Sequence, residues 1–170
     1  MAVIDIKKIF KKVPDFHITG DGHTAARLFD GYSNLVEIGK ITNDAIYDTT
    51  LMFGNCDNLK KIELSEFDAS SVTNMTQMFA HCSALEELDL SNFKTQNLTT
   101  TRDMFFNCTS LKKLNISNFN FSNITNFDNM FGEGNFAVPN DCYILVKDSE
   151  AKEWFMNNFS NLTNVHYIGE

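Results

Sequence analysis

The chain has 170 residues and a formal net charge of −8, with 43% hydrophobic and 21% charged residues. This length suits one domain or one short repeat array, and the apolar content excludes a disordered chain. The acidic balance argues against sequence-independent binding to nucleic acid, and no apolar run of ~18 residues predicts a transmembrane helix or membrane insertion.

The N-terminal segment is basic although the chain as a whole is acidic. Residues 1–13 carry four lysines and one aspartate, a charge of +3, which leaves −11 for the rest of the chain. Charges every few residues argue against a signal peptide. The segment predicts a short helix over residues 5–13 that caps the first repeat or docks on an anionic surface. Its two faces are apolar and basic: Ile6, Ile9, Phe10 and Val13 against Lys7, Lys8, Lys11 and Lys12.

An internal repeat with a period of 26 residues dominates the centre of the chain. Nine apolar positions recur in register over three units, which indicates a solenoid. A shorter unit precedes them, with Leu28-Phe29 in place of Met-Phe and a spacing of 24 to the next unit. The missing two residues fall in the connection after the strand. The clearest repeated positions are Met52, Met78, Met104 and Met130, and then Cys56, Cys82 and Cys108.

Each unit contains two predicted elements. The alternation Leu88-x-Leu90 is typical of a short strand. The apolar spacing i, i+3, i+4, i+7 that begins at Met75 and ends at Cys82 predicts a two-turn helix, which Asn74 would cap. Stacked units then give an α/β leucine-rich-repeat solenoid, with a parallel sheet on one side, short helices on the other and caps at both ends.

The period ends at Gly132, and a different pattern follows. A strand over 142–146, a helix over 149–157 and a last strand over 165–168 are predicted there, with Trp154 and Phe155 as the apolar contribution of the helix. The expected organisation is an N-terminal capping helix and loop (1–24), leucine-rich repeats of 26-residue period with a degenerate first unit (25–137), and a C-terminal cap (138–170).

The cysteines and histidines do not predict catalysis or metal binding. The periodic cysteines are expected inside the fold as inert thiols, because neighbouring helices ~8–10 Å apart exceed the reach of a disulfide. His81 and Cys82 are adjacent, but adjacent residues on a helix point ~100° apart. The other histidines lack metal-ligand spacing. We therefore predict no enzyme activity, no cofactor and no metal.

The exposed strand positions are the candidate binding surface. They form three rows across the sheet, which read either as cross-strand charge pairing or as a polar surface for a ligand. Phe106 and Phe121 depart from the repeat and fit either exposed aromatic area or core. The rows are Lys61, Glu87 and Lys113; Glu63, Asp89 and Asn115; and Ser65, Ser91 and Ser117.

The repeats resemble a known family. The units LMFGNCDNLKKIELSEFDASSVTNM and QMFAHCSALEELDLSNFKTQNLTT are similar to the BspA-like leucine-rich repeats of bacteria, over about residues 28–131. The segment YILVKDSEAKEWFMNNFSNLTNVHYI resembles the closing unit of such repeats in proteins of low-GC Gram-positive bacteria and their phages. The resemblance implies surface-exposed adhesion or ligand-binding proteins, or tail and other virion proteins.

Two functional classes follow from these expectations. The first is a non-enzymatic binding or adhesion module, displayed on a phage virion (tail or other surface component) or on a bacterial surface. It would contact a protein or glycan on a cell envelope, or other virion proteins, and copies would associate through their ends. The alternative is a purely structural component that acts as spacer or decoration. The missing signal peptide favours the virion, whereas a fragment of a longer chain would favour the bacterial surface.

Overall fold

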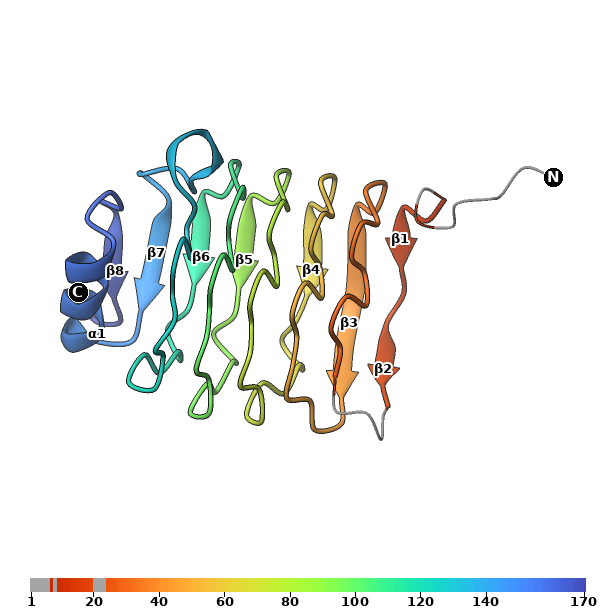
Figure 1. Ribbon diagram of the computed structural model, residues 1–170, viewed down its shortest axis with the longest axis horizontal. Coiled ribbons are helices and arrows are strands. Elements are labelled where there is room, and N and C mark those ends of the chain that lie inside the picture. Colours follow the sequence, from red (N-terminus) through yellow and green to blue (C-terminus); the bar gives the residue numbers. More distant parts are fainter. Residues whose placement is uncertain (1–6, 8, 20–23) are drawn as a thin grey trace.

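The computed structural model describes residues 7, 9–19 and 24–170, and in it the chain winds into a parallel β-solenoid (Figure 1). The predicted repeat solenoid with a parallel sheet is therefore confirmed. The strands are β1 (Lys12–Val13), β2 (Phe16–Ile18), β3 (Glu37–Asn43), β4 (Lys61–Glu63), β5 (Glu87–Asp89), β6 (Lys113–Asn115), β7 (Tyr143–Val146) and β8 (Val165–Tyr167). The helical elements are the 3-10 helix η2 (Gly134–Phe136) and the α-helix α1 (Ser149–Asn158).

The strand register follows the repeat. β5 pairs with β6 so that Glu87 faces Lys113, one period of 26 residues later. β3 pairs with β4 at a spacing of 24, with Glu37 opposite Lys61, and the register becomes irregular after Ile38. Farther along, the bridge between Asp48 and Asn74 restores the spacing of 26. The shortening of the first unit therefore lies between Ile38 and Asp48, in the second part of β3 and the turn after it, whereas it was predicted in the connection after the strand.

The side opposite the sheet is built from turns, so the short helices predicted there are wrong. From Met75 to Cys82 the N–H groups alternate between two kinds of acceptor. The N–H groups of Met78, Ala80 and Cys82 close turns within the coil, and that of Thr76 donates to the side chain of Asn74. The others donate to the next coil: Met75 to Thr100, Gln77 to Arg102, Phe79 to Met104 and His81 to Phe106, at 2.7–3.0 Å.

Left-handed residues explain why no helix forms. Gln77 has φ 57° and His81 has φ 63°, so two residues in this coil interrupt any right-handed helix. The side-chain oxygen of Asn74 accepts from the N–H of Thr76 at 2.9 Å and begins a turn instead of capping a helix. The same two left-handed positions recur in other coils, at Arg27, Leu51, Asp103 and Asn129, and at Gly31, Asn55 and Asn107.

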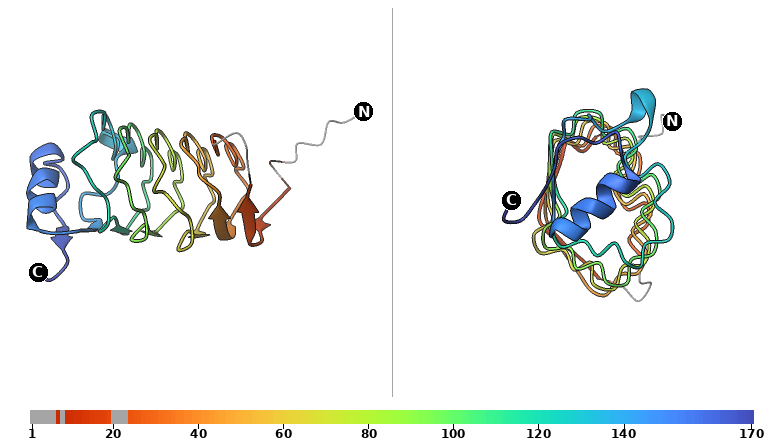
Figure 2. Two further views of the ribbon diagram at one scale, coloured as in Figure 1. Left: turned by 90° about the horizontal axis from the view of Figure 1, so that it is seen from below. Right: turned by 90° about the vertical axis from the view of Figure 1, so that its left-hand side faces the viewer.

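Columns of stacked aromatic rings fill the interior. The coils superpose when seen along the solenoid axis (Figure 2), so each repeated side chain packs on its equivalents in the coils before and after. Ring centroids in the first column are 5.4–5.9 Å apart. These side chains are buried: Phe29, Phe53, Phe79, Phe105 and Phe131 in this column, and Phe67, Phe93 and Phe119 in a second.

The N-terminal segment forms strands where a capping helix was predicted. Lys12 and Val13 make β1, opposite Glu37 and Ile38 of β3, so the predicted helix over 5–13 is wrong in its described part. Pairing with β3 satisfies the backbone of an edge strand, which a short isolated helix would leave open. Residues 1–6, 8 and 20–23, and with them Lys8, lie outside the described residues.

The C-terminal cap has the predicted order of strand, helix and strand. β7 and β8 extend the sheet beyond β6, and α1 crosses the end of the solenoid (Figure 2). The carboxylate of Asp148 accepts from the N–H of Ala151 at 2.9 Å and caps the helix. Phe155 and Phe159 pack on Phe131 at centroid distances of 5.2 and 4.9 Å, which closes the aromatic column.

Candidate ligand-binding surface

The first predicted row lies on the sheet as a line of exposed charges. Lys61, Glu87 and Lys113 stand at the same repeat position of β4, β5 and β6, and all three are exposed. The register extends the row toward the N-terminus, because Lys12 faces Glu37 and Glu37 faces Lys61. Basic and acidic side chains therefore alternate over five strands. We call these five residues the charged row.

The N-terminal half of the charged row is neutralised by ion pairs. Lys12 Nζ lies 2.6 Å from Glu37 Oε2, and Lys61 Nζ lies 3.8 Å from Glu37 Oε1. The hydrogen bond from Lys12 holds the pKa of the Glu37 carboxyl below its ordinary value. Within the described part of the chain, no ion pair joins Glu87 to Lys61 or Lys113. The charges of Glu87 and Lys113 are thus left for solvent or a partner.

The second and third rows are largely used by the fold. The side-chain oxygens of Glu63, Asp89 and Asn115 accept from the N–H of the serine two residues later, at 3.0, 2.8 and 3.2 Å. Hydrogen bonds from Ser65 also lower the pKa of the Glu63 carboxyl. These contacts turn the chain at the end of each strand. Ser65 is exposed and Ser91 half-buried, but Ser117 is buried, so its predicted place on the exposed surface is wrong.

The N-terminal lysines do not share one docking face. Lys7 Nζ donates to the carbonyl oxygen of Asp30 at 2.6 Å and lies 5.8 Å from the ring centroid of Tyr32. Lys12 instead belongs to the charged row, and Lys11 is exposed between them. The predicted basic helix face is therefore wrong, because Lys12 lies in the strand β1, and Lys7 and Lys12 contact different parts of the fold.

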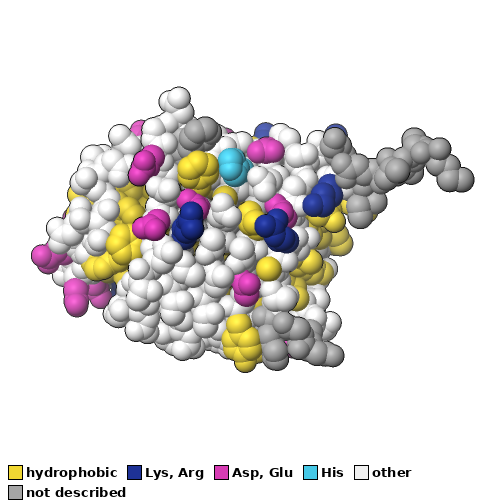
Figure 3. Space-filling model, in the orientation of Figure 1, with side chains coloured by type: hydrophobic (Ala, Val, Ile, Leu, Met, Phe, Trp, Pro, Cys, Tyr) yellow, Lys and Arg dark blue, Asp and Glu magenta, His cyan; other side chains and the backbone are white. Residues whose placement is uncertain are grey.

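The turn side carries scattered charges of both signs. Figure 3 shows this side in front, and large parts of it are uncharged. Two of its cations are paired with their own neighbours: Arg27 with Asp30 at 2.7 Å, and Arg102 with Asp103 at 3.3 Å.

The cysteines are buried and free, as predicted, but the predicted reason was wrong. Coils joined by backbone hydrogen bonds lie ~4.8 Å apart, not at the 8–10 Å of packed helices. The thiols are instead held as donors, for example from Cys82 Sγ to the carbonyl oxygen of Phe53 at 3.2 Å. Burial raises the pKa of the Cys56, Cys108 and Cys142 thiols to about 12.

His81 is held away from the thiol beside it. Its Nδ1 lies 2.9 Å from the side-chain nitrogen of Asn107, and its ring packs edge-on to Phe106 at 5.4 Å. Phe106 is half-buried in this contact. Phe121 is buried, with its ring 4.6 Å from that of Trp154, and belongs to the core. Neither phenylalanine therefore adds a broad exposed aromatic surface.

A hollow of about 350 Å³ lies between α1 and residues 118–122 and was not predicted from the sequence. Two signals pointed to it. Trp154 is the single tryptophan of the chain, and Phe121 replaces the small residues Ala69 and Thr95 at the equivalent repeat positions. Both aromatic residues mark the place where the stacking of coils stops.

Metal and membrane sites are not seen in the described residues. No three of their His, Cys, Asp and Glu side chains are grouped so that they could hold a metal ion. Their helices are also too short or too polar to cross a membrane.

Comparison with protein families identifies the repeats. A family model described as "Mycoplasma protein of unknown function, DUF285" matches residues 23–141, more than half of the chain. The chain belongs to this family. The DUF285 match begins just before the first coil, includes β3 to β6 and ends before β7, so it spans the stacked coils and leaves out α1 and β8. No curated protein matches the chain.

Proposed function

We propose that this DUF285 protein is a BspA-like, non-enzymatic binding module. It is displayed on a phage virion, as a tail or other surface component, or on a bacterial surface. The charged row contacts a protein or glycan of a cell envelope, or another virion protein. The single observation that carries this proposal is the alternation of basic and acidic side chains over five strands on one face of the solenoid, with β1, β3 and β4 in one sheet and β5 and β6 in the next.

The charged row has the properties that a binding surface needs. Lys12, Glu37 and Lys61 stand on strands of one hydrogen-bonded sheet, and Glu87 and Lys113 stand on strands of a second. Within each sheet, the spacing of these side chains is therefore fixed before any partner arrives. Lys61 and Lys113 are exposed, and Glu87 between them has no ion-pair partner in the described residues. Alternating charges favour a partner of complementary alternation and repel one of uniform charge.

Charge reversal on the sheet tests this proposal. The variant Lys61→Glu/Lys113→Glu is compared with Lys60→Glu/Lys94→Glu, which makes the same change of charge at exposed positions outside the row. Binding is measured on a glycan array and on isolated envelopes of Gram-positive bacteria, with circular dichroism as the check of folding. We expect the first variant to lose about tenfold or more in affinity and the control to stay within about twofold. Equal binding of both variants would overturn the role of the charged row.

The alternative function, a structural spacer or decoration, is favoured by apolar side chains at both ends of the solenoid. Ile9 and Phe10 are 54% and 50% exposed near the N-terminal end, and Ile168 is 59% exposed at the other. End-to-end association of copies would cover them. Sedimentation of the wild type and of Ile168→Asp tests this: concentration-dependent assembly that the variant abolishes would support the spacer, and a monomer at all concentrations would exclude it.

A further inference from the structure

The hollow beside α1 exists because no further turn-forming coil stacks on residues 118–122. After β7 the chain leaves the solenoid at Asp148 and enters α1, which crosses the end of the stack (Figure 2). Residues 118–122 therefore face the helix across an open space instead of packing against another coil. The space has a volume of about 350 Å³, within the range of small-molecule sites.

A backbone carbonyl oxygen at this edge lacks the side-chain amide donor that binds the equivalent oxygen in earlier coils. The side-chain amide of Asn97 donates to the carbonyl oxygen of Ser70, and that of Asn123 to the carbonyl oxygen of Gln96, both at 2.8 Å. Ser122 occupies the same position in the last coil, and no described residue donates to its carbonyl oxygen. A ligand in the hollow can supply the missing donor.

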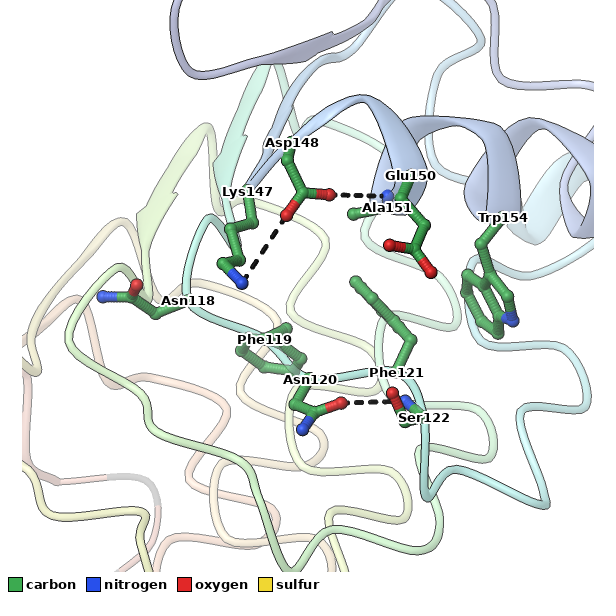
Figure 4. A pocket seen from close by; sticks show the side chains of 10 residues that line it. All are labelled: Asn118, Phe119, Asn120, Phe121, Ser122, Lys147, Asp148, Glu150, Ala151 and Trp154. Carbon is green, nitrogen blue, oxygen red and sulfur yellow. Dashed lines mark hydrogen bonds and ion pairs between the residues drawn. The ribbon is translucent and has the colours of Figure 1, made fainter.

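The side chains of the hollow add further acceptors and few donors. The Glu150 carboxylate has no hydrogen-bond or ion-pair partner among the described residues, and Figure 4 shows it above the stacked rings of Phe121 and Trp154. Asn120 accepts from the N–H of Ser122 at 2.9 Å, which leaves its amide NH₂ for a ligand. The hollow also contains a cation, the ammonium group of Lys147, whose Nζ lies 3.5 Å from Asp148 Oδ2.

Aromatic rings form the apolar part of the lining. Trp154 is half-buried and stacks on Phe121, with centroids 4.6 Å apart and an interplanar angle of 23°. Phe119 adds to this apolar wall and lies to the left of Phe121 in Figure 4. An apolar wall with a few convergent polar groups is the usual composition of a small-ligand site.

We propose that this hollow is a binding site for a neutral saccharide. Sugar hydroxyls donate to the Ser122 carbonyl oxygen and the Glu150 carboxylate, and accept from Lys147 and the Asn120 amide. The apolar face of the sugar ring packs on the aromatic wall. Two carboxylates disfavour an anionic ligand, and the Lys147 ammonium disfavours a multivalent cation. This inference rests on the proposed function only in taking the protein for a binding module, since it uses none of the charged row.

The single tryptophan makes the test direct, because any change in tryptophan emission comes from Trp154. The full chain is titrated with neutral homo-oligosaccharides of glucose, galactose, mannose and N-acetylglucosamine up to millimolar concentration. We expect a saturable change of emission with at least one of them. Glu150→Ala should weaken that binding by about tenfold or more. Glu153→Ala, the same change on the same helix outside the hollow, should leave binding unchanged.

The two proposals fail separately. No emission change with any of these saccharides, or equal binding by the Glu150→Ala and Glu153→Ala variants, would overturn the saccharide site. Envelope binding that still depends on Lys61 and Lys113 would leave the charged-row proposal standing in that case. Saccharide binding that survives the Lys61→Glu/Lys113→Glu change would confirm that the hollow acts independently.

Discussion

The Cys82 thiol donates a hydrogen bond to the carbonyl oxygen of Phe53, 3.2 Å away and one coil earlier. The same bond joins Cys56 to Phe29 and Cys108 to Phe79 at the same distance. Each thiol thus connects two coils beside the aromatic column. The cysteine position of the repeat is therefore a structural donor, placed where a small apolar side chain also fills the core.

We predict that the native protein does not react with a thiol reagent. The thiols are buried and protonated at neutral pH, whereas the thiolate is the reactive form. Ellman's reagent should label none of the four cysteines in the folded chain and all four after denaturation. Labelling of Cys82 in the native state, at the rate of a free thiol, would contradict the buried donor.

Stability should fall at alkaline pH because of the same groups. Burial raises the pKa of the Cys108 thiol from its ordinary value of 9.0 to about 12, so the native state holds this proton when the unfolded chain releases it. The buried, protonated thiol makes its full contribution to the free energy of unfolding below about pH 9. This contribution is lost as pH rises toward 12, by about 1 kcal/mol per pH unit for each thiol. Denaturant unfolding of the wild type and Cys108→Ala between these limits measures it. A variant with the slope of the wild type would contradict the prediction.

Truncation in the aromatic column should be far more costly than truncation beside it. Phe79 is fully buried between Phe53 and Phe105, so Phe79→Ala should cost about 3–5 kcal/mol in the free energy of unfolding. Phe106→Ala is the matched control, since that ring is half-buried at the edge of His81. Chemical denaturation measures both. Similar losses for the two variants would argue against a stacked column.

The left-handed turn positions should accept glycine without loss. Gln77 has φ 57°, a conformation that costs a side-chain residue roughly 1–2 kcal/mol, so Gln77→Gly should be neutral or stabilising by up to about 1 kcal/mol. Thr76→Gly, one residue earlier, should destabilise by about 0.5–1 kcal/mol. Thermal unfolding distinguishes them. If both substitutions destabilise equally, the turn assignment is wrong and a helix would be the better description.

The sequence predicted the core but not the conformation of the turn side. The spacing of Met75, Met78, Phe79 and Cys82 fits one face of a helix and also two successive four-residue turns, because both bury every fourth residue. Hydrogen bonding decides between them, and it depends on the neighbouring coil. One signal was available in the repeat: the left-handed column contains Gly31, Asn55, His81 and Asn107, residue types that tolerate positive φ.

The two ends differ in how well their sequences predicted them. At the C-terminus, the apolar run Tyr143–Val146 and the helical segment after it agree with the tertiary contacts, so strand and helix were predictable. At the N-terminus, Ile9, Phe10 and Val13 have helical spacing, but Val13 pairs with Ile38 in the sheet. Pairing with the open edge of β3 therefore determines the conformation of this segment, against its helical spacing. The hollow beside α1 required the path of the chain after β7, which no repeat period contains.

Mass spectrometry of the natural source tests the central claim most directly, by locating the chain in purified virions, in the cell envelope or in the cytosol. A displayed binding module should be found at fixed stoichiometry in virions or enriched in the envelope. A chain recovered only as a free cytosolic monomer would contradict the account.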